Sequence, residues 1–124
     1  MMLAAFVSYI YDGNDFEAII ESAIITTLAG ASGVLIGGNS TKHFGTREGY
    51  LLVGLVWIVF SIFGMLPFRL SYYIPNIADA FFETMSGFTT TGATILTDIE
   101  ALPHGLLFWR SMLQWLGGMG IVVL

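Results

Sequence analysis

A run of small and hydroxylated residues, Thr89-Thr90-Thr91-Gly92-Ala93-Thr94, lies between two apolar segments of the sequence. Its threonines offer hydroxyl oxygens, and its backbone offers carbonyl oxygens where Gly92 permits φ values that other residues avoid. A ring of such oxygens can replace the water around a dehydrated cation, as in an ion filter. The residue types therefore predict a cation-binding loop, although a Thr/Gly run alone is also typical of an ordinary turn.

The segments that flank this loop favour the cation-binding interpretation. Asn76–Phe88 has a helical pattern, but at about 1.5 Å per residue it is too short for a hydrocarbon core of about 30 Å. A longer apolar run, expected to begin as a helix at His104 or Gly105, follows and continues to Leu124. Non-helical backbone at membrane depth is stable only where it is buried in protein or lines a water-filled path. The sequence therefore predicts a re-entrant pore loop over residues 75–103.

The short helix predicted before the loop has its own start signal and packing face. Asn76 can cap its N-terminus, and Asp79 lies in the first turn, where the helix dipole favours an acidic residue. The partially negative C-terminal end would then point toward the cation path. Four apolar residues at i, i+3, i+4 and i+7 spacing are expected to pack against neighbouring helices: Ala78, Phe81, Phe82 and Met85.

The composition is that of a membrane protein. Of 124 residues, 56% are hydrophobic and 10% are charged, against about 25% charged in soluble domains. An unusually apolar soluble domain is the alternative. The chain has no cysteine, which excludes disulfides and thiolate zinc sites. The net charge of −5 and four scattered basic residues give no nucleic-acid-binding patch.

The predicted fold is an all-α membrane protein, with transmembrane helices plus one re-entrant pore helix and filter loop. Met1–Tyr11 is expected to be the tail of a longer helix, and Phe16–Gly38 and Gly49–Phe68 are predicted to span the membrane. We expect two parts: residues 1–46 as N-terminal membrane helices, and residues 47–124 as a helix–pore loop–helix unit. No cap or anchor follows Leu124, so we expect the chain to be cut at or within its last helix.

Basic residues predict the orientation. Loop 39–48 carries Lys42 and Arg47, whereas the turn at 12–15 carries no basic residue, so loop 39–48 is predicted to be cytoplasmic. The turn at Asp12, the 69–76 link and the 98–100 loop would then lie outside, and the re-entrant segment would enter from the outer face. The two histidines are expected to be interfacial loop residues and not metal ligands; they are His43 and His104.

Two features of the last predicted helix remain. Arg110 lies about two turns into it, where an arginine is costly and usually paired. We predict that Glu83 is its partner and that the pair steadies the loop; the alternative is that Arg110 extends to the outer interface. The Gly117-Gly118-Met119-Gly120 run would permit a close helix crossing or weaken the helix, and the sequence does not decide between them.

Three stretches resemble the TrkH-type potassium uptake proteins of the Trk/Ktr/HKT superfamily. They are Phe-Glu-Thr-Met-Ser-Gly-Phe-Thr-Thr-Thr-Gly-Ala-Thr at 82–94, Leu-Pro-His-Gly at 102–105 and Phe-Trp-Arg-Ser-Met-Leu-Gln-Trp-Leu-Gly-Gly-Met-Gly at 108–120. The resemblance is dense from Arg47 to Leu124. It implies a chain of four helix–pore loop–helix repeats around a pseudo-fourfold axis, preceded by two extra helices. Residues 47–124 would be the first repeat, and residues 1–46 would hold the extra helices.

The resemblance also implies roles for single residues. The carbonyls of Thr90, Thr91, Gly92 and Ala93 are the expected potassium ligands, and potassium is the only metal expected. Thr94, Glu83 and Arg110 would support the filter. Glycine at position 92 favours potassium, because family members with serine there tend to conduct sodium. Thr94 stands where potassium channels have a second glycine, which implies a less stringent filter.

The implied function is potassium transport across a bacterial plasma (inner) membrane by a multi-pass, pore-forming subunit, without enzymatic chemistry or a cofactor. The implied partners are the remaining repeats of a full-length chain, a second copy in a homodimer, a cytosolic nucleotide-binding regulatory subunit and the lipid membrane. One repeat cannot enclose an ion, so the isolated chain is expected to be inactive. Two alternatives are a non-conducting membrane interaction fragment and a homotetrameric cation channel.

Overall fold

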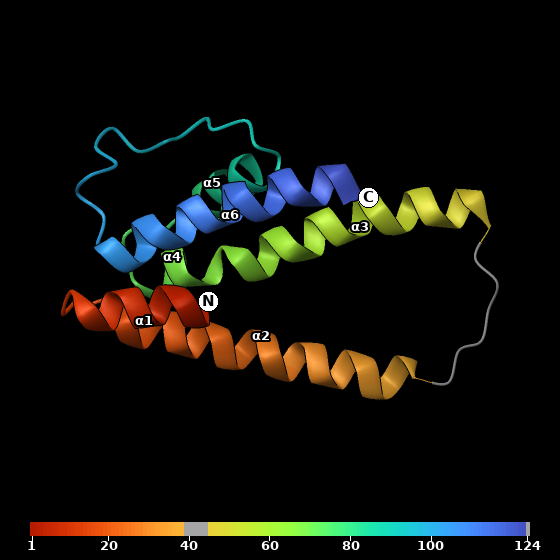
Figure 1. The fold of residues 1–124 in the computed structure, drawn as a ribbon, viewed down its shortest axis with the longest axis horizontal. Coiled ribbons are helices and arrows are strands. Elements are labelled where there is room, and N and C mark those ends of the chain that lie inside the picture. Colours follow the sequence, from red (N-terminus) through yellow and green to blue (C-terminus); the bar gives the residue numbers. More distant parts are fainter. Residues whose placement is uncertain (39–44, 124) are drawn as a thin grey trace.

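A computed structural model describes residues 1–38 and 45–123 (Figure 1). The described chain is helical and has no strand. The helices, in order, are α1 (Met2–Ile10), α2 (Phe16–Gly37), α3 (Thr46–Gly64), α4 (Leu66–Leu70), α5 (Ile77–Phe88) and α6 (His104–Val123). Two stretches, Phe16–Gly37 and Thr46–Leu70, are long and apolar enough to cross a membrane. The predicted all-α membrane fold is therefore confirmed, while most of the predicted cytoplasmic loop, with Lys42 and His43, lies outside the described residues.

The α1–α2 hairpin packs on the beginning of α6 around a buried carboxylate. Asp15 is fully buried, and the Ser8 hydroxyl donates a hydrogen bond to its Oδ1 at 2.6 Å. Gly105, in the first turn of α6, leaves room for this carboxylate, because a Cβ there would overlap Asp15 Oδ2. The Tyr11 ring stacks on the His104 ring with centroids 4.5 Å apart. The exposed His104 is thus the first residue of α6 and not a loop residue.

The helix predicted over 49–68 begins earlier and is interrupted. α3 begins at Thr46, where the Glu48 carboxylate accepts a hydrogen bond from the Gly45 N–H at 3.2 Å. The helix ends at Gly64, and the five-residue α4 follows with Pro67 in its first turn. Proline has no N–H to donate, which is tolerated in a first turn, where that N–H would have no helical partner.

Gly64 marks the close crossing of α3, α5 and α6. A Cβ at this position would lie 2.8 Å from Thr84 Cγ2 and 3.1 Å from the Phe88 ring. The carbonyl of Gly64, at the end of α3, accepts a hydrogen bond from the Trp109 indole N–H at 3.0 Å. A helix-end carbonyl that would otherwise have no partner is therefore satisfied by a side chain of α6.

The packing face predicted for α5 is confirmed only in part: the Met85 sulfur contacts the Ser61 hydroxyl of α3 at 3.0 Å. Ala78 and Phe82 are exposed, and Phe81 and Met85 are only partly buried. The buried residues of the helix are small or polar for the most part: Ala80, Glu83, Thr84, Ser86, Gly87 and Phe88. In a membrane protein, large apolar side chains lose little by facing lipid, whereas small and polar residues gain by packing against protein. The predicted cap is present, since Asn76 Oδ1 accepts the Ala78 N–H at 3.1 Å.

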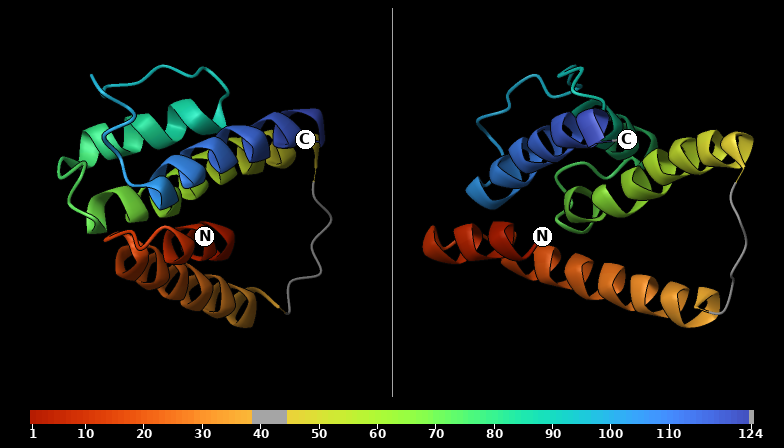
Figure 2. Two further views of the ribbon diagram at one scale, coloured as in Figure 1. Left: turned by 60° about the vertical axis from the view of Figure 1, so that its left-hand side comes forward. Right: turned by 45° about the vertical axis from the view of Figure 1, so that its right-hand side comes forward.

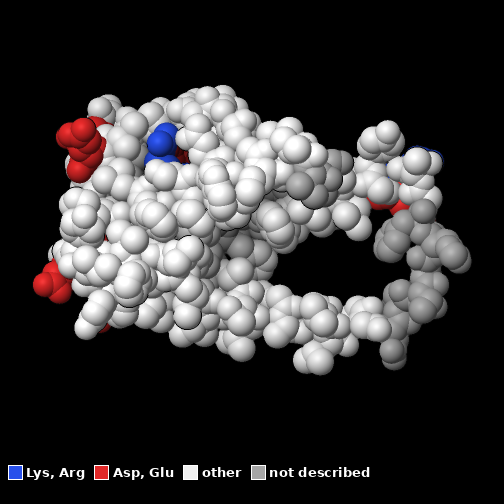
Figure 3. Space-filling view, viewed as in Figure 1, with Lys and Arg blue, Asp and Glu red and all other residues white. Residues whose placement is uncertain are grey.

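The path of the chain places the loop beside α5. After α5, residues 89–103 return along that helix to the end of the molecule where the α1–α2 turn lies, and α6 starts there (Figures 1 and 2). α2 and α3 extend toward the opposite end as two separate arms. Figure 3 shows an opening between these arms, acidic side chains at the end with the α1–α2 turn, and a largely uncharged middle.

Candidate functional site

The loop that follows α5 has an irregular backbone. Thr90 has φ 57° and Gly92 has φ 72°, so both adopt left-handed conformations. Glycine adopts this region freely, while a β-branched residue such as threonine does so only where the surrounding contacts impose it. Residues 89–93 are exposed, although the end of α5 before them is buried. The hexapeptide is therefore a shaped loop and not a continuation of the helix.

Ser86 of α5 fixes the direction of the loop peptides. Its carbonyl accepts hydrogen bonds from the N–H groups of Thr91 at 3.0 Å and Gly92 at 3.4 Å. In a trans peptide, C=O and N–H point in opposite directions, so the carbonyls of Thr90 and Thr91 point away from α5. The Ala93 carbonyl points toward α5, because it accepts a hydrogen bond from the Ser86 hydroxyl at 2.6 Å.

The loop carbonyls therefore fall into two groups. Within the described residues, no hydrogen bond reaches the carbonyls of Thr90, Thr91 or Gly92, whereas the carbonyl of Ala93 has the Ser86 hydroxyl as its donor. Three of the four oxygens predicted as ion ligands are thus available to a cation. The fourth, on Ala93, is already engaged by the protein.

Glu83 and Arg110 form an ion pair beside Thr94, the last residue of the hexapeptide. Arg110 Nε lies 2.6 Å from Glu83 Oε1, and the Glu83 side chain is fully buried. Its other oxygen, Oε2, accepts hydrogen bonds from the Thr94 hydroxyl at 2.9 Å and the Ile95 N–H at 3.2 Å. One buried carboxylate therefore joins three elements: α5, which carries it; α6, which carries Arg110; and the backbone where the chain leaves the loop.

Gly117 brings α6 against the beginning of the loop. A Cβ at this position would overlap the Phe88 carbonyl, at the end of α5. α6 is continuous through the glycine run and continues to Val123. Of the two interpretations that the sequence left open for this run, the structure shows a close helix crossing.

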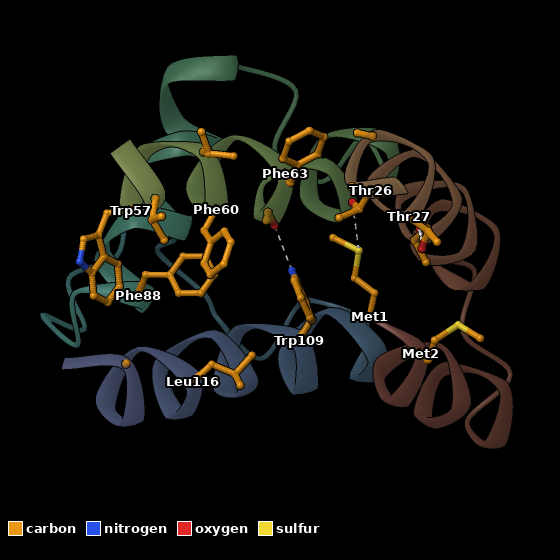
Figure 4. Close-up of a pocket in the computed structure, with 17 residues that line it drawn as sticks. Met1, Met2, Thr26, Thr27, Trp57, Phe60, Phe63, Phe88, Trp109 and Leu116 are labelled. Atoms are coloured by element: carbon orange, nitrogen blue, oxygen red, sulfur yellow. Dashed lines mark hydrogen bonds between the residues drawn. The ribbon is translucent and has the colours of Figure 1, made fainter. Parts of the chain in front are cut away.

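A separate cavity of about 650 Å³ lies between the arms, bounded by α1, α2, α3, α6 and the end of α5 (Figure 4). Its lining is apolar and includes Met1, Phe60, Phe63 and Leu116. The few polar groups there have partners: the dashed lines in Figure 4 mark the bond from the Trp109 indole and the contact of Thr26 with the Met1 sulfur. The hydroxyls in its lining, on Thr26 and Thr27, already donate hydrogen bonds to carbonyls of their own helix, α2, so the loop after α5 is the candidate cation site.

Sequence reasoning identified the loop, Glu83 and Arg110 but missed Ser86. The signal was present in the Ser86-Gly87 pair, since two small residues in the last turn of a helix permit a chain segment to approach closely. In the described residues there is no group of three or more His, Asp or Glu side chains that could hold a metal ion. The cation chemistry available here is therefore that of carbonyl and hydroxyl oxygens.

Two stretches long and apolar enough to cross a membrane, and a loop with available carbonyl oxygens between a short and a long helix, fit a membrane cation transport protein. The TrkH family model, described as a cation transport protein, matches residues 16–124. The chain belongs to this family. No solved structure matches the chain.

Relatives come from bacteria and from an archaeon. The chain is 44% identical over 129 residues to the Trk system potassium uptake protein TrkH of Escherichia coli K12, covering 100% of this chain and 26% of the relative. It is 42% identical over 119 residues to the protein of the same name from Halomonas elongata, covering 95% and 25%. An uncharacterised cation transporter of Methanocaldococcus jannaschii is 34% identical over 123 residues, covering 99% and 26%. The chain thus spans about a quarter of the length of these relatives.

Proposed function

We propose that this chain forms one wall of a potassium selectivity filter and contributes to passive potassium transport through a membrane. The observation that carries the proposal is the row of available carbonyls on Thr90, Thr91 and Gly92. Two of these point away from the helix that supports the loop, as an ion path requires. The names of the relatives, which are potassium uptake proteins, support potassium as the ion.

The supporting residues keep the roles predicted for them. Glu83, held by Arg110, fixes Thr94 and therefore the end of the loop where the chain leaves it. Gly92, with its positive φ, supplies the turn between the available carbonyls and the carbonyl of Ala93. Potassium is the substrate and is bound by these oxygens alone, and no enzymatic step is involved.

The loop works as a re-entrant segment within residues 75–103, and residues 47–124 form the first of four repeats. An ion needs oxygens on all sides, so three further walls are required. Carbonyls that faced lipid would each cost several kcal/mol, on the order of the cost of an unsatisfied buried polar group. Residues 1–124 alone are therefore inactive, and the other walls come from the rest of a longer chain.

The partners and location follow from the family resemblance. The complete transporter is a multi-pass protein of a bacterial plasma (inner) membrane and pairs with a second copy as a homodimer. A cytosolic nucleotide-binding subunit regulates it. The exposed apolar side chains of α2 and α3 face lipid or other parts of this assembly.

A hybrid transporter tests the proposal. In the Escherichia coli relative, the segment that this chain matches, 26% of that protein, is replaced by residues 1–124. In a potassium-uptake-deficient bacterium, the hybrid is expected to restore growth at low potassium and to take up Rb⁺, a tracer for K⁺. A hybrid that reaches the membrane in normal amount and takes up no Rb⁺ would overturn the proposal.

The isolated chain separates the two alternatives from the proposal. We expect residues 1–124 alone to give no growth at low potassium. Growth would instead favour the homotetrameric channel, in which four copies supply the four walls. A non-conducting interaction fragment predicts failure of both the isolated chain and the hybrid.

A further inference from the structure

We propose that Ser86 is a positioning residue that sets the ion selectivity of the filter by holding the Ala93 carbonyl away from the ion path. This inference rests on the proposed function of the loop. Ser86 is buried, with 6% of its surface exposed, and its hydroxyl lies 2.6 Å from the Ala93 oxygen. A carbonyl engaged in this way points toward α5 and not toward an ion beside Thr90 and Thr91.

Ser86 holds the loop with both its backbone and its side chain. The backbone carbonyl binds the N–H groups of Thr91 and Gly92, which orients the Thr90 and Thr91 carbonyls outward. The side-chain hydroxyl binds the next carbonyl after Gly92, which orients that one inward. The filter wall therefore presents the Thr90 and Thr91 oxygens outward, whereas the Ala93 oxygen points inward.

Without the Ser86 hydroxyl, the Ala93 carbonyl is no longer held in its inward direction. The Ala93 carbonyl then has no donor, and the backbone around Gly92 is free to change its direction. A filter discriminates between cations by the number and placement of its carbonyls, so a less fixed wall accommodates the smaller Na⁺ more easily. One neutral hydrogen bond corresponds to a change of about two- to tenfold in an equilibrium ratio.

The rest of the loop does not depend on this bond. Glu83 Oε2 separately holds the Thr94 hydroxyl and the Ile95 N–H. The backbone bonds from Ser86 to Thr91 and Gly92 do not involve the side chain. A Ser86→Ala variant is therefore expected to fold and to reach the membrane.

The test compares two serine-to-alanine changes in the hybrid transporter. Ser86→Ala removes the hydroxyl that binds the loop. Ser22→Ala removes another buried hydroxyl, which lies 2.6 Å from the Ala18 carbonyl of its own helix, α2. Ser86→Thr keeps the hydroxyl at the loop. The measurement is the ratio of Rb⁺ uptake to Na⁺ uptake, normalised to the amount of transporter in the membrane.

We expect Ser86→Ala to lower the Rb⁺/Na⁺ ratio about two- to tenfold. Ser22→Ala and Ser86→Thr are expected to stay within about twofold of the unsubstituted hybrid, which is less than one hydrogen bond is worth. An unchanged ratio in Ser86→Ala would overturn the inference, as would an equal fall in Ser22→Ala or Ser86→Thr. Failure of Ser86→Ala to reach the membrane would also contradict it. An unsubstituted hybrid without Rb⁺ uptake would overturn the proposed function itself.

Discussion

The region where the loop after α5 packs against α5 and α6, which we call the loop end, and the two arms, α2 and α3, are stabilised in different ways. At the loop end, Glu83 and Ser86 are buried and hydrogen-bonded, and Gly117 lies directly against the end of α5. In the arms, large apolar side chains such as Leu35 of α2 and Leu51 of α3 are 84% and 68% exposed. The arm glycines of α2 have open space around them.

This contrast follows from the two kinds of backbone. A regular helix satisfies its own N–H and C=O groups, so an arm can face lipid with apolar side chains and needs few tertiary contacts. An irregular loop cannot pair all of its own backbone N–H and C=O groups, so these groups must find hydrogen-bond partners elsewhere in the protein. Buried serine, threonine and glutamate side chains therefore gather where the backbone leaves the helix. Substitutions at the loop end should be costly, and chemically matched substitutions in the arms should not.

The largest effect is expected from breaking the buried ion pair. Glu83→Gln or Arg110→Gln leaves a partner without its counter-charge, at a cost of about 3–5 kcal/mol. Either change should abolish Rb⁺ uptake by the hybrid transporter. The matched arm variants, Glu21→Gln and Arg47→Gln, alter exposed residues and should retain uptake.

The exchange of both charges gives the control for this pair. Glu83→Arg combined with Arg110→Glu should restore part of the uptake that Arg110→Glu alone removes. Restoration is incomplete because arginine cannot accept the hydrogen bonds of Thr94 and Ile95. No restoration at all would count against the pairing.

A smaller effect is expected at the helix crossing. Gly117→Ala places a methyl group against the Phe88 carbonyl, and overpacking of this kind costs about 1–3 kcal/mol. Gly33→Ala in α2 meets open space and gains up to about 1 kcal/mol of helix propensity. Thermal unfolding of the detergent-solubilised hybrid should show a lower Tm for the first variant and an equal or higher Tm for the second. Equal Tm values would show that the crossing is looser than described.

A change at Gly92 should affect selectivity more than stability. A side chain at φ 72° costs roughly 1–2 kcal/mol, but space is available, since the nearest side-chain atom to an added Cβ is Gln114 Nε2 at 3.8 Å. Gly92→Ser should therefore lower the Rb⁺/Na⁺ uptake ratio of the hybrid while leaving its Tm within a few degrees. Gly30→Ala, in the arm, should leave the Rb⁺/Na⁺ ratio unchanged. An unchanged Rb⁺/Na⁺ uptake ratio in Gly92→Ser would show that Gly92 does not determine ion selectivity.

The smallest effect is expected where the arms join the loop end. The fully buried Asp15 places its Oδ2 beside Gly105, in the first turn of α6, where a negative charge is favourable by about 0.3–1 kcal/mol. Asp15→Asn should lower the Tm of the hybrid slightly. Asp12→Asn, on the exposed turn nearby, should leave the Tm unchanged, because asparagine also tolerates its φ of 49°. An equal Tm shift in both variants would contradict the proposed stabilising contact of Asp15 with the first turn of α6.

Much of the fold could be predicted from the sequence because the signals are local. The bounds of α2 and α5 and the start of α6 differ by at most a residue from the predicted ones, and Asn76 caps α5 as expected. The apolar face of α5 was predicted wrongly at Ala78 and Phe82, which are exposed. In a membrane, an apolar residue can face lipid as readily as protein. The break after Gly64 was also missed, although the glycine and Pro67 both lie near it.

The site could be predicted in part. Two opposite charges in otherwise apolar segments, Glu83 and Arg110, have few partners to choose from, and the structure brings them together. The direction of each loop carbonyl has no local signal of this kind. It depends on Ser86 contacting residues five to seven positions away after a left-handed turn at Thr90. No local pattern in the sequence indicates the hydrogen bond from the Ser86 hydroxyl to the Ala93 oxygen.

The most direct test of the account is to locate Rb⁺ by anomalous X-ray scattering in crystals of the hybrid transporter. We predict Rb⁺ density beside the carbonyls of Thr90, Thr91 and Gly92, with the Ala93 carbonyl still bound to the Ser86 hydroxyl. Rb⁺ absent from this loop, or loop carbonyls that point into α5, would contradict it.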